Sequence, residues 1–311
     1  MKDLILSIYY STPNLQHLTI LGKIANRLWQ KLFKNIADVV FSARFNSSRE
    51  TREKNLSFRE KELITSLTSF PARIGKVHLS IECILDQSIK PDRVILWLAS
   101  EQFPDGKESL PMTLLRLESK GLEIEFCEDL RSHKKYYYAL KKHPNANVIM
   151  FDDDLYYHKD IIKNLLELNQ KNPTCIAATR VHRLLIDKNS LKPYRSWFHN
   201  YNGGDPSHYN MHTSGAGTLI PPNLPLDSTF FDIKLIRTLS PHSDDVWWKV
   251  NLIRLGIKVV TNGRFNKDPL TIGDAFKNSL VSQNTFEGKK DIQLKETFDY
   301  LEIKIPDDLD T

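Results

Sequence analysis

Three consecutive carboxylates, Asp152, Asp153 and Asp154, follow the apolar run Val148 to Phe151. Adjacent negative charges repel one another, so a fold that holds them together needs positive charge nearby. If the chain stays extended, Asp152 and Asp154 share one side, roughly 6–7 Å apart, and Asp153 is turned away. Two carboxylates so placed suit Mg²⁺ or Mn²⁺, whose other ligands are commonly water and phosphate oxygens. The pattern indicates a cation that binds a nucleotide diphosphate; the alternative is a solvated acidic turn that caps the next helix.

Hydroxyl and cationic side chains occur in two segments that this site would need. ITSLTSFPARI carries hydroxyls and a guanidinium after an apolar strand, and such groups suit a ribose, a base edge or a diphosphate. DLRSHKKYYYALKKHPN places cations just before the acidic strand. A capped turn or a solvated helix face is the alternative for these segments. The residues assigned to the donor are Thr65, Ser66, Thr68, Arg73, Lys134, Lys135, Asp152 and Asp153, and those assigned to the metal are Asp152 and Asp154.

A second acidic pair, Asp244 and Asp245, follows Ser243 in the segment LSPHSDDVWWK. Ser243 is a natural helix N-cap, and a helix dipole favours carboxylates in the first turn, so one interpretation is purely structural. The other interpretation makes Asp244 or Asp245 a general base for an incoming hydroxyl. In that case Trp247 or Trp248 would stack on a sugar face.

Small residues and two histidines complete the set of candidates. Ser214 and Gly215, in HTSGAGTLIPP, would let a substrate approach the backbone closely, although a tight turn explains them as well. We assign both to the acceptor or sugar, together with the two tryptophans. His212 and His242 are candidate metal ligands, but a lone histidine more often satisfies local hydrogen bonds.

The elements that must position these side chains alternate between strand and helix from residue 63 onward. Repeated β-α-β units predict an α/β fold with a mainly parallel sheet and helices on both faces. Ligands bind beyond the carboxyl ends of such strands, where the three aspartates lie. Residues 183–213 predict an irregular excursion that faces the substrate. Strands are expected at 63–67, 93–98, 122–126, 147–151 and 175–180, and helices at 77–87, 111–120, 134–142 and 159–169.

Residues 15–42 place apolar side chains at roughly helical spacing, with Lys23, Arg27, Lys31 and Lys34 between them. A basic amphipathic helix of this kind can make peripheral contact with an anionic membrane. A packing or oligomerisation helix is the alternative. Residues 46–59 are polar and charged, so they indicate a linker. The domain organisation predicted is therefore a helical extension with a linker at 1–61, followed by a catalytic domain at 62–311.

Charge and cysteine content limit the class of protein. The net charge of the 311 residues is +5, and residues 1–61 hold 11 Lys and Arg against 5 Asp and Glu, so the excess is amino-terminal. An odd number of cysteines, three, argues against a disulfide framework. The opening MKDLILSIYYSTPN is too short for a signal sequence, and no run approaches the roughly 20 apolar residues of a membrane span. We expect a cytoplasmic protein that can reach the inner face of the membrane and binds no nucleic acid.

Seven segments in order resemble a family of bacterial polysaccharide-assembly glycosyltransferases of the capsule and O-antigen type. They are ITSLTSFPARI, SIKPDRVILWLASEQFP, DLRSHKKYYYALKKHPN, VIMFDDDLYY, SGAGTLIPP, SDDVWWK and SQNTFEGKKDIQLKETFDYL, and they span residues 62–301. The resemblance implies a GT-A fold with a nucleotide-sugar half at 62–158 and an acceptor half at 159–311. It implies that Asp152 and Asp154 form the D-x-D motif and that Asp244 or Asp245 is the base of an inverting enzyme. The implied partners are a nucleotide-sugar donor such as UDP-hexose, Mn²⁺ or Mg²⁺, and a glycan or lipid-linked glycan acceptor.

Two rivals use the same residues differently. A haloacid-dehalogenase-like phosphatase also opens on an apolar strand and D-x-D, with Asp152 as nucleophile and Asp154 as acid/base. The three strand-helix units expected before the cluster count against that interpretation. A non-catalytic protein that uses the basic helix to reach a membrane or a nucleic acid is a different class. The acidic and aromatic remainder of the chain makes poor sense for it.

Overall fold

The computed structural model describes residues 2–12, 20–44, 60–188, 190–273 and 288–303. The helices are α1 Lys2–Ser11, α2 Ile20–Arg44, α3 Val77–Leu85, α4 Met112–Leu115, α5 Lys134–Lys142, α6 Ile161–Lys171, α7 Ile233–Leu239, α8 Asp244–Arg254 and α10 Lys289–Tyr300. The longer strands are β1 Leu63–Thr68, β2 Arg93–Ala99, β3 Leu122–Cys127 and β4 Asn147–Met150. The shorter ones are β5 Ile176–Ala178, β6 Val181–Arg183, β7 Ile186–Asp187, β8 Ser190–Leu191, β9 Asn210–His212, β10 Thr218–Ile220 and β11 Val259–Val260.

The central sheet has seven strands in the order β11-β5-β10-β4-β1-β2-β3. Strand β10 runs antiparallel to β4 and β5, and the other neighbouring pairs are parallel. The expected mainly parallel α/β sheet is therefore confirmed. The carboxyl ends of β1 and β4 lie next to each other, because Ser66 pairs with Met150.

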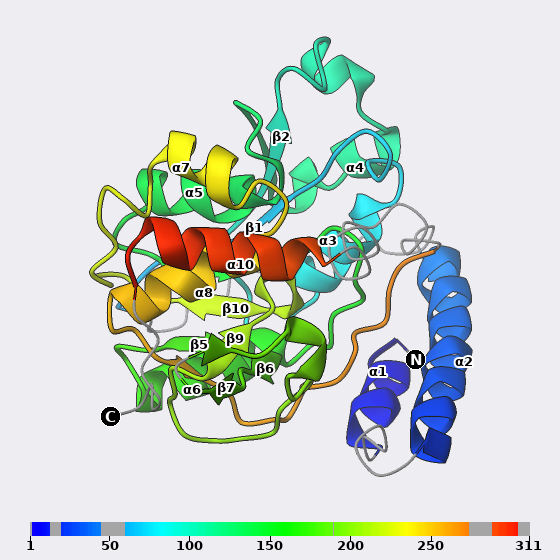
Figure 1. Ribbon diagram of the computed structural model, residues 1–311. Helices are drawn as coiled ribbons and strands as arrows, with labels where there is room; N and C mark the ends of the chain where they lie inside the picture. Colours follow the sequence, from blue (N-terminus) through cyan, green and yellow to red (C-terminus); the bar gives the residue numbers. More distant parts are fainter. Residues whose placement is uncertain (1, 13–19, 45–59, 189, 274–287, 304–311) are drawn as a thin grey trace.

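Helices cover both faces of this sheet (Figure 1). Side chains alternate along a strand, so Leu63 and Leu67 of β1 pack in the cluster that includes α3 and α6. Ile64 faces the other way and packs with Ala139 of α5. Helices α7 and α8 pack in a cluster with Met150 on that second side, and α10 packs against α8. The acidic ends of β4 and α8 can therefore meet at one edge.

Two expected elements differ from the structure. The helix expected at 111–120 is broken into α4 and the single 3₁₀ turn Glu118–Lys120, which ends where Gly121 adopts a left-handed φ of 100°. The excursion at 183–213 is less irregular than expected, since it contains short strands. The expected linker at 46–59 and residues 15–19 lie outside the described residues.

The amino-terminal helices α1 and α2 lie side by side against the α/β body (Figure 1). Phe33, Ala37 and Phe41 of α2 are buried in the same hydrophobic cluster as β1 and α3. The ring of Phe41 lies 4.4 Å from that of Tyr156, whose hydroxyl donates a 2.8 Å hydrogen bond to Asp38. Helix α1 was not anticipated from the sequence, and its packing makes the extension part of the core.

The outer surface of α1 and α2 carries most of the exposed large apolar side chains among the described residues. They are Leu4, Ile8, Leu21, Ile24, Leu28, Trp29, Leu32, Ile36 and Val39, and this set is called the apolar stripe below. None of the described helices has the length and apolar composition that crossing a bilayer requires.

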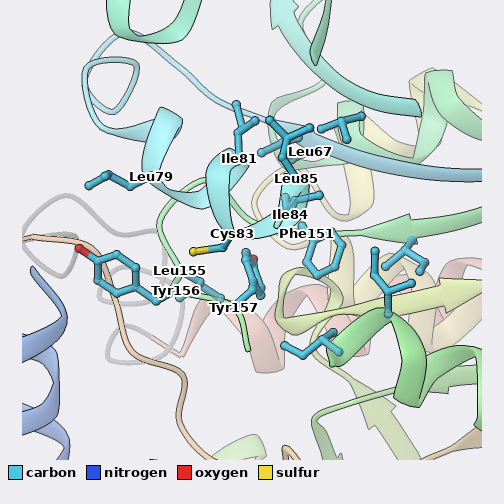
Figure 2. Close-up of a cluster of buried hydrophobic side chains, with 14 of the residues drawn as sticks. Leu67, Leu79, Ile81, Cys83, Ile84, Leu85, Phe151, Leu155, Tyr156 and Tyr157 are labelled. Carbon is cyan, nitrogen blue, oxygen red and sulfur yellow. The ribbon is translucent and has the colours of Figure 1, made fainter. Parts of the chain in front are cut away.

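A compact apolar layer fixes the segment that follows β4. Figure 2 shows Phe151, Leu155 and Tyr157 beside Cys83 and Ile84 of α3. The backbone of the segment is held too, because the Ser80 hydroxyl donates to the carbonyl of Leu155 at 2.9 Å and Ile272 N–H donates to that of Asp154 at 2.7 Å. Packing and hydrogen bonds thus fix the backbone of the turn that carries the three aspartates.

Candidate active site

The chain does not stay extended through the three aspartates. Strand β4 ends at Met150, and a turn begins at Asp153. Asp153 and Asp154 therefore face the same guanidinium, with Nη1 of Arg73 lying 2.9 Å from Oδ1 of Asp153 and 2.9 Å from Oδ2 of Asp154. The expectation that Asp153 points away from the other two is wrong, because it assumed an extended backbone.

The Arg73 side of the cluster holds more negative charge than one guanidinium balances. Ser69 adds a 2.5 Å hydrogen bond from its hydroxyl to Asp153. Burial nevertheless raises the pKa of Asp153, against the effect of Arg73. Burial and the neighbouring charge of Asp153 raise the pKa of Asp154 to about 7. These carboxyls would be stabilised in their ionised form by a further cation.

Lys135 joins the two acidic clusters. Its Nζ lies 2.7 Å from Oδ1 of Asp152 and 3.0 Å from Oδ2 of Asp244, and its side chain is 4% exposed. Burial acts to lower the pKa of Lys135, but Asp152, Asp244 and Asp245 outweigh burial and hold it above its usual value. The ammonium is therefore a permanent charge between the end of β4 and the start of α8.

Asp244 and Asp245 begin α8 but differ in surroundings. Oδ1 of Asp245 accepts hydrogen bonds from the backbone N–H of Ser214 at 2.8 Å and from its hydroxyl at 2.7 Å. Lys290 of α10 lies 3.6 Å from Oδ2 of Asp245. Burial acts to raise the pKa of Asp245, yet Lys290, Lys135 and the Ser214 N–H lower it to about 2. Asp244 has Lys135 as the cation next to its buried Oδ2.

Gly215 fits directly against Asp152. A Cβ at position 215 would overlap the Asp152 carboxylate. The Asp152 N–H donates to the Gly215 carbonyl at 3.1 Å, and the Tyr157 hydroxyl donates to the same carbonyl at 2.7 Å. The 3₁₀ turn Ser214–Ala216 thus touches the first acidic cluster through Gly215 and the second through Ser214.

The charge balance of the site fits a divalent cation. When all five carboxylates, Asp152 to Asp154 with Asp244 and Asp245, are ionised, they exceed the three cations Arg73, Lys135 and Lys290 by two charges. Within the described ranges, no three Asp, Glu, His or Cys side chains converge as a complete ligand set. Magnesium and manganese commonly take one or two carboxylates and complete their shell with phosphate and water. Asp152, 40% exposed, and Asp154, 16% exposed, are the groups that would hold the ion.

Some residues expected at the donor are used elsewhere. Thr65 and Ser66 are fully buried, because β1 lies between β2 and β4, and their hydroxyls donate to the carbonyls of Arg93 and Lys135. Both hydroxyls are therefore used inside the sheet and do not face the acidic cluster. Thr68, half-buried, donates to the Trp97 carbonyl at 2.8 Å.

The other donor cation expected next to Lys135 is also used structurally. Lys134 is buried and lies 2.5 Å from Asp129, away from the acidic cluster. Neighbouring residues of a helix point in different directions, so only one of the two lysines can reach the site.

The tryptophans and histidines do not join the site as expected. Trp247 and Trp248 are fully buried, so neither can stack on a sugar, and the Nε1–H of Trp247 donates to the Phe230 carbonyl at 2.9 Å. His212 is buried against Trp248, and burial lowers its pKa to about 4. His242 contacts Arg131. Neither histidine lies among the groups that could ligate a metal in the described part of the chain.

Two contributors to the site were not assigned a role from the sequence. Lys290 lies in the last described helix, and nothing local in EGKKDIQLKETF distinguishes it from Lys289. Tyr157 lies in the aromatic pair after the aspartates. Its hydroxyl accepts a hydrogen bond from the Asp152 N–H at 2.7 Å, so it helps to hold the acidic turn.

No family model and no curated protein sequence matches the chain. Among solved structures, a mannosyltransferase from Pyrobaculum calidifontis in complex with GDP-Man and Mn²⁺ is similar over 98% of this chain and 78% of that chain, with 10% identity and a TM-score of 0.47. Residues 1–349 of S. aureus TarS are similar over 76% of this chain and 70% of that chain, with 10% identity and a TM-score of 0.41. A CMP:2-keto-3-deoxy-manno-octonic acid synthetase complexed with CTP is similar over 65% of this chain and 89% of that chain, with 10% identity and a TM-score of 0.39. Similarity this distant identifies no family, so the functional proposal rests on the site itself.

Proposed function

We propose that the chain is a metal-dependent, inverting glycosyltransferase of the GT-A type. It would transfer a sugar from a nucleotide-diphosphate donor, UDP-hexose in the simplest case, to a glycan or lipid-linked acceptor in surface polysaccharide synthesis. The observation that carries the proposal is the meeting of two acidic clusters at Lys135. Its ammonium contacts Asp152 and Asp244, which lie about 90 residues apart in the sequence.

Such a reaction needs two differently charged places close together. Bond breakage leaves the electron pair on the departing diphosphate, which gains negative charge. Arg73 and Lys135 supply fixed positive charge on the donor side. A divalent ion held by Asp152 and Asp154 would supply further stabilisation of that charge when bound.

We assign the general base to Asp245. In an inverting displacement the acceptor hydroxyl oxygen bonds to the anomeric carbon while its proton passes to a carboxylate on the opposite side. Asp245 is fixed by Ser214 and is 21% exposed, against 10% for Asp244. Its lowered pKa keeps it ionised. Its weak basicity suits a late proton transfer, when the attacking hydroxyl has become strongly acidic. Asp244 would position Lys135.

The phosphatase alternative is not favoured. Strands β1, β2 and β3 precede β4 in the chain, so the D-x-D does not follow the first strand of the sheet.

We further propose that α2 makes the peripheral membrane contact. Most of the apolar stripe faces away from the body, and the exposed Lys31 lies beside it at helical spacing. Burial of the stripe in the interface together with attraction to anionic lipids would hold the enzyme beside a lipid-linked acceptor.

The test of the donor site is a screen of nucleotide sugars by thermal shift and by metal-dependent hydrolysis. We expect UDP with Mn²⁺ to raise the melting temperature and Asp154→Ala to abolish the rise. Asp299→Ala, an exposed carboxylate on α10, should leave it intact. An undiminished rise in Asp154→Ala would refute the site, and hydrolysis of simple phosphomonoesters alone would favour a phosphatase.

A further inference from the structure

A cavity lies apart from the acidic clusters, between α2 and two segments of the α/β body. Its volume is about 380 Å³, and its walls come from α1, α2, residues 195–199 and residues 267–268. None of the five clustered carboxylates lines it. The cavity exists only because the amino-terminal helices pack on the body, so it is called the junction pocket below.

The junction pocket is strongly cationic. Lys23 and Arg27 project from α2, and Arg195 and Lys267 from the body. The carboxylate in its wall is Asp268, whose charge is already met by Arg180 at 2.7 Å. Within the described part of the chain, Lys23, Arg27 and Arg195 form no ion pair. Among the described residues, the four cations of the pocket wall outnumber its carboxylate, Asp268, so the wall carries a net positive charge.

Lys267 adds a half-buried ammonium whose hydrogen bonds go to neutral groups. Its Nζ donates to the carbonyls of Tyr9 and Thr12 and, at 2.9 Å, to the Thr12 hydroxyl. Burial lowers the pKa of Lys267 to about 8. An anion in the pocket would offset this loss of hydration.

Aromatic side chains form another part of the walls. Trp29 and Trp197 line the pocket, and Phe198 stands at it with 52% of its surface exposed. Exposed aromatic faces suit a sugar ring or an apolar chain next to the charged group. The wall chemistry thus fits an anion attached to something less polar, such as a phosphate ester.

A short chain of contacts connects the junction pocket to the candidate active site. Arg180 binds Asp268 in the pocket wall through its guanidinium, and its backbone carbonyl accepts from the Thr213 N–H at 3.1 Å. The next residue, Ser214, holds the proposed base Asp245. The wall of the pocket is therefore connected through Arg180 and Thr213 to the residue that holds the proposed base.

We propose that the junction pocket binds a phosphate or diphosphate group carried by the acceptor substrate. This inference rests on the proposed transferase function and specifies the acceptor class as phosphorylated. Guanidinium groups bind phosphate oxygens through paired hydrogen bonds, which assigns the main contacts to Arg27 and Arg195. Phosphate on a lipid carrier and phosphate on a glycan share this chemistry.

Two soluble probes separate the sources of the phosphate. n-Dodecyl phosphate, used below its critical micelle concentration, carries the group on an apolar chain, and glucose 1-phosphate carries it on a sugar. Each is titrated into the full chain without divalent ions, and tryptophan fluorescence is followed because Trp29 and Trp197 line the pocket. Dodecyl maltoside controls for the chain alone. Tighter binding of dodecyl phosphate supports a lipid-linked acceptor, and tighter binding of glucose 1-phosphate supports a phosphorylated glycan.

Variants that remove a charge test whether the phosphate group binds in the junction pocket. Arg27→Gln and Arg195→Gln should each weaken phosphate binding about tenfold or more, because each removes a hydrogen bond to a charged group. Arg116→Gln, an exposed arginine outside the pocket, should leave it unchanged. Absence of phosphate binding, or binding that persists in both pocket variants, overturns the proposal.

Donor hydrolysis distinguishes failure of the pocket from failure of the enzyme. Both pocket variants should hydrolyse the nucleotide sugar at the wild-type rate, since neither residue touches the acidic clusters. A wild-type chain that binds phosphate in the pocket but hydrolyses no nucleotide sugar would overturn the acceptor role while leaving the anion site. Hydrolysis without phosphate binding would overturn the pocket and leave the donor site intact.

Discussion

The backbone of Gly215 lies against the carboxylate of Asp152 so closely that no side chain fits between them. Gly215→Ala should push the carboxylate aside, and a displacement on the order of 1 Å can lower kcat/KM about a hundredfold. The expected result is a large loss of transfer and weakened Mn²⁺-dependent UDP binding, with the fold retained. Gly204→Ala is the matched control, because a Cβ there meets no atom within 4 Å. Equal activity of the two variants would contradict the close approach.

The two carboxylates that begin α8 should respond differently to neutralisation. Asp245→Asn keeps an acceptor for Ser214, so donor binding should persist while kcat falls by roughly 10²–10⁴-fold, the usual contribution of a general base. Asp244→Asn leaves Asp152 as the contact of Lys135 and should weaken donor affinity. Calorimetric titration with UDP and Mn²⁺ beside a transfer assay separates the two effects. If Asp244→Asn instead removes transfer and spares binding, Asp244 is the base.

Asp154 should make stability depend on pH. Its folded pKa of about 7 exceeds the ordinary 3.8, so folding favours the protonated acid, and this stabilisation is complete below about pH 4 and lost as the pH rises through about 7. Asp154→Asn should therefore match the wild type at low pH and exceed its free energy of unfolding by roughly 1–3 kcal/mol above neutrality. Urea unfolding across this range measures the difference. A constant difference at all pH values would exclude the raised pKa.

The apolar stripe should bind membranes whether or not the transfer reaction takes place. Leu28 and Leu32 are 64% and 50% exposed, so replacing both with Glu should leave the thermal stability unchanged. Flotation with phosphatidylcholine vesicles that contain phosphatidylglycerol should be lost in this variant and weakened by high salt in the wild type. Met112→Glu, at an exposed apolar residue outside the stripe, should float like the wild type. Flotation of the double variant would assign membrane binding to another surface.

Local sequence patterns were sufficient to predict the main strands of the sheet and the position of the acidic cluster at the end of β4. The apolar runs and their spacing predicted β1 to β4 because buried parallel strands are continuous apolar segments. Asp152 and Asp244 could be connected only through Lys135, and the sequence did not indicate which of Lys134 and Lys135 points inward. The turn at Asp153 could not be foreseen either, since it depends on contacts with α3 and with Ile272.

The tryptophans show why the acceptor side was harder to predict. Trp247 and Trp248 occupy adjacent positions of α8, so they point in different directions, and a helix buried on one side would expose one of them. Helix α8 is instead buried nearly all round, because the sheet covers Trp248 and α10 packs on Val246. That second layer comes from residues 289–300, whose own amphipathic pattern is weak. Lys290 enters the site with the same layer.

The packing of α2 on the turn after β4 links the helix proposed to contact the membrane to the turn that carries the aspartates. Phe41 packs on the ring of Tyr156 and Asp38 accepts a hydrogen bond from its hydroxyl, two residues beyond Asp154. A force that lifts the helix from the body must therefore also loosen the loop on which the aspartates are mounted. If the proposed roles hold, a change that detaches α2 would disturb the membrane contact and the acidic turn together.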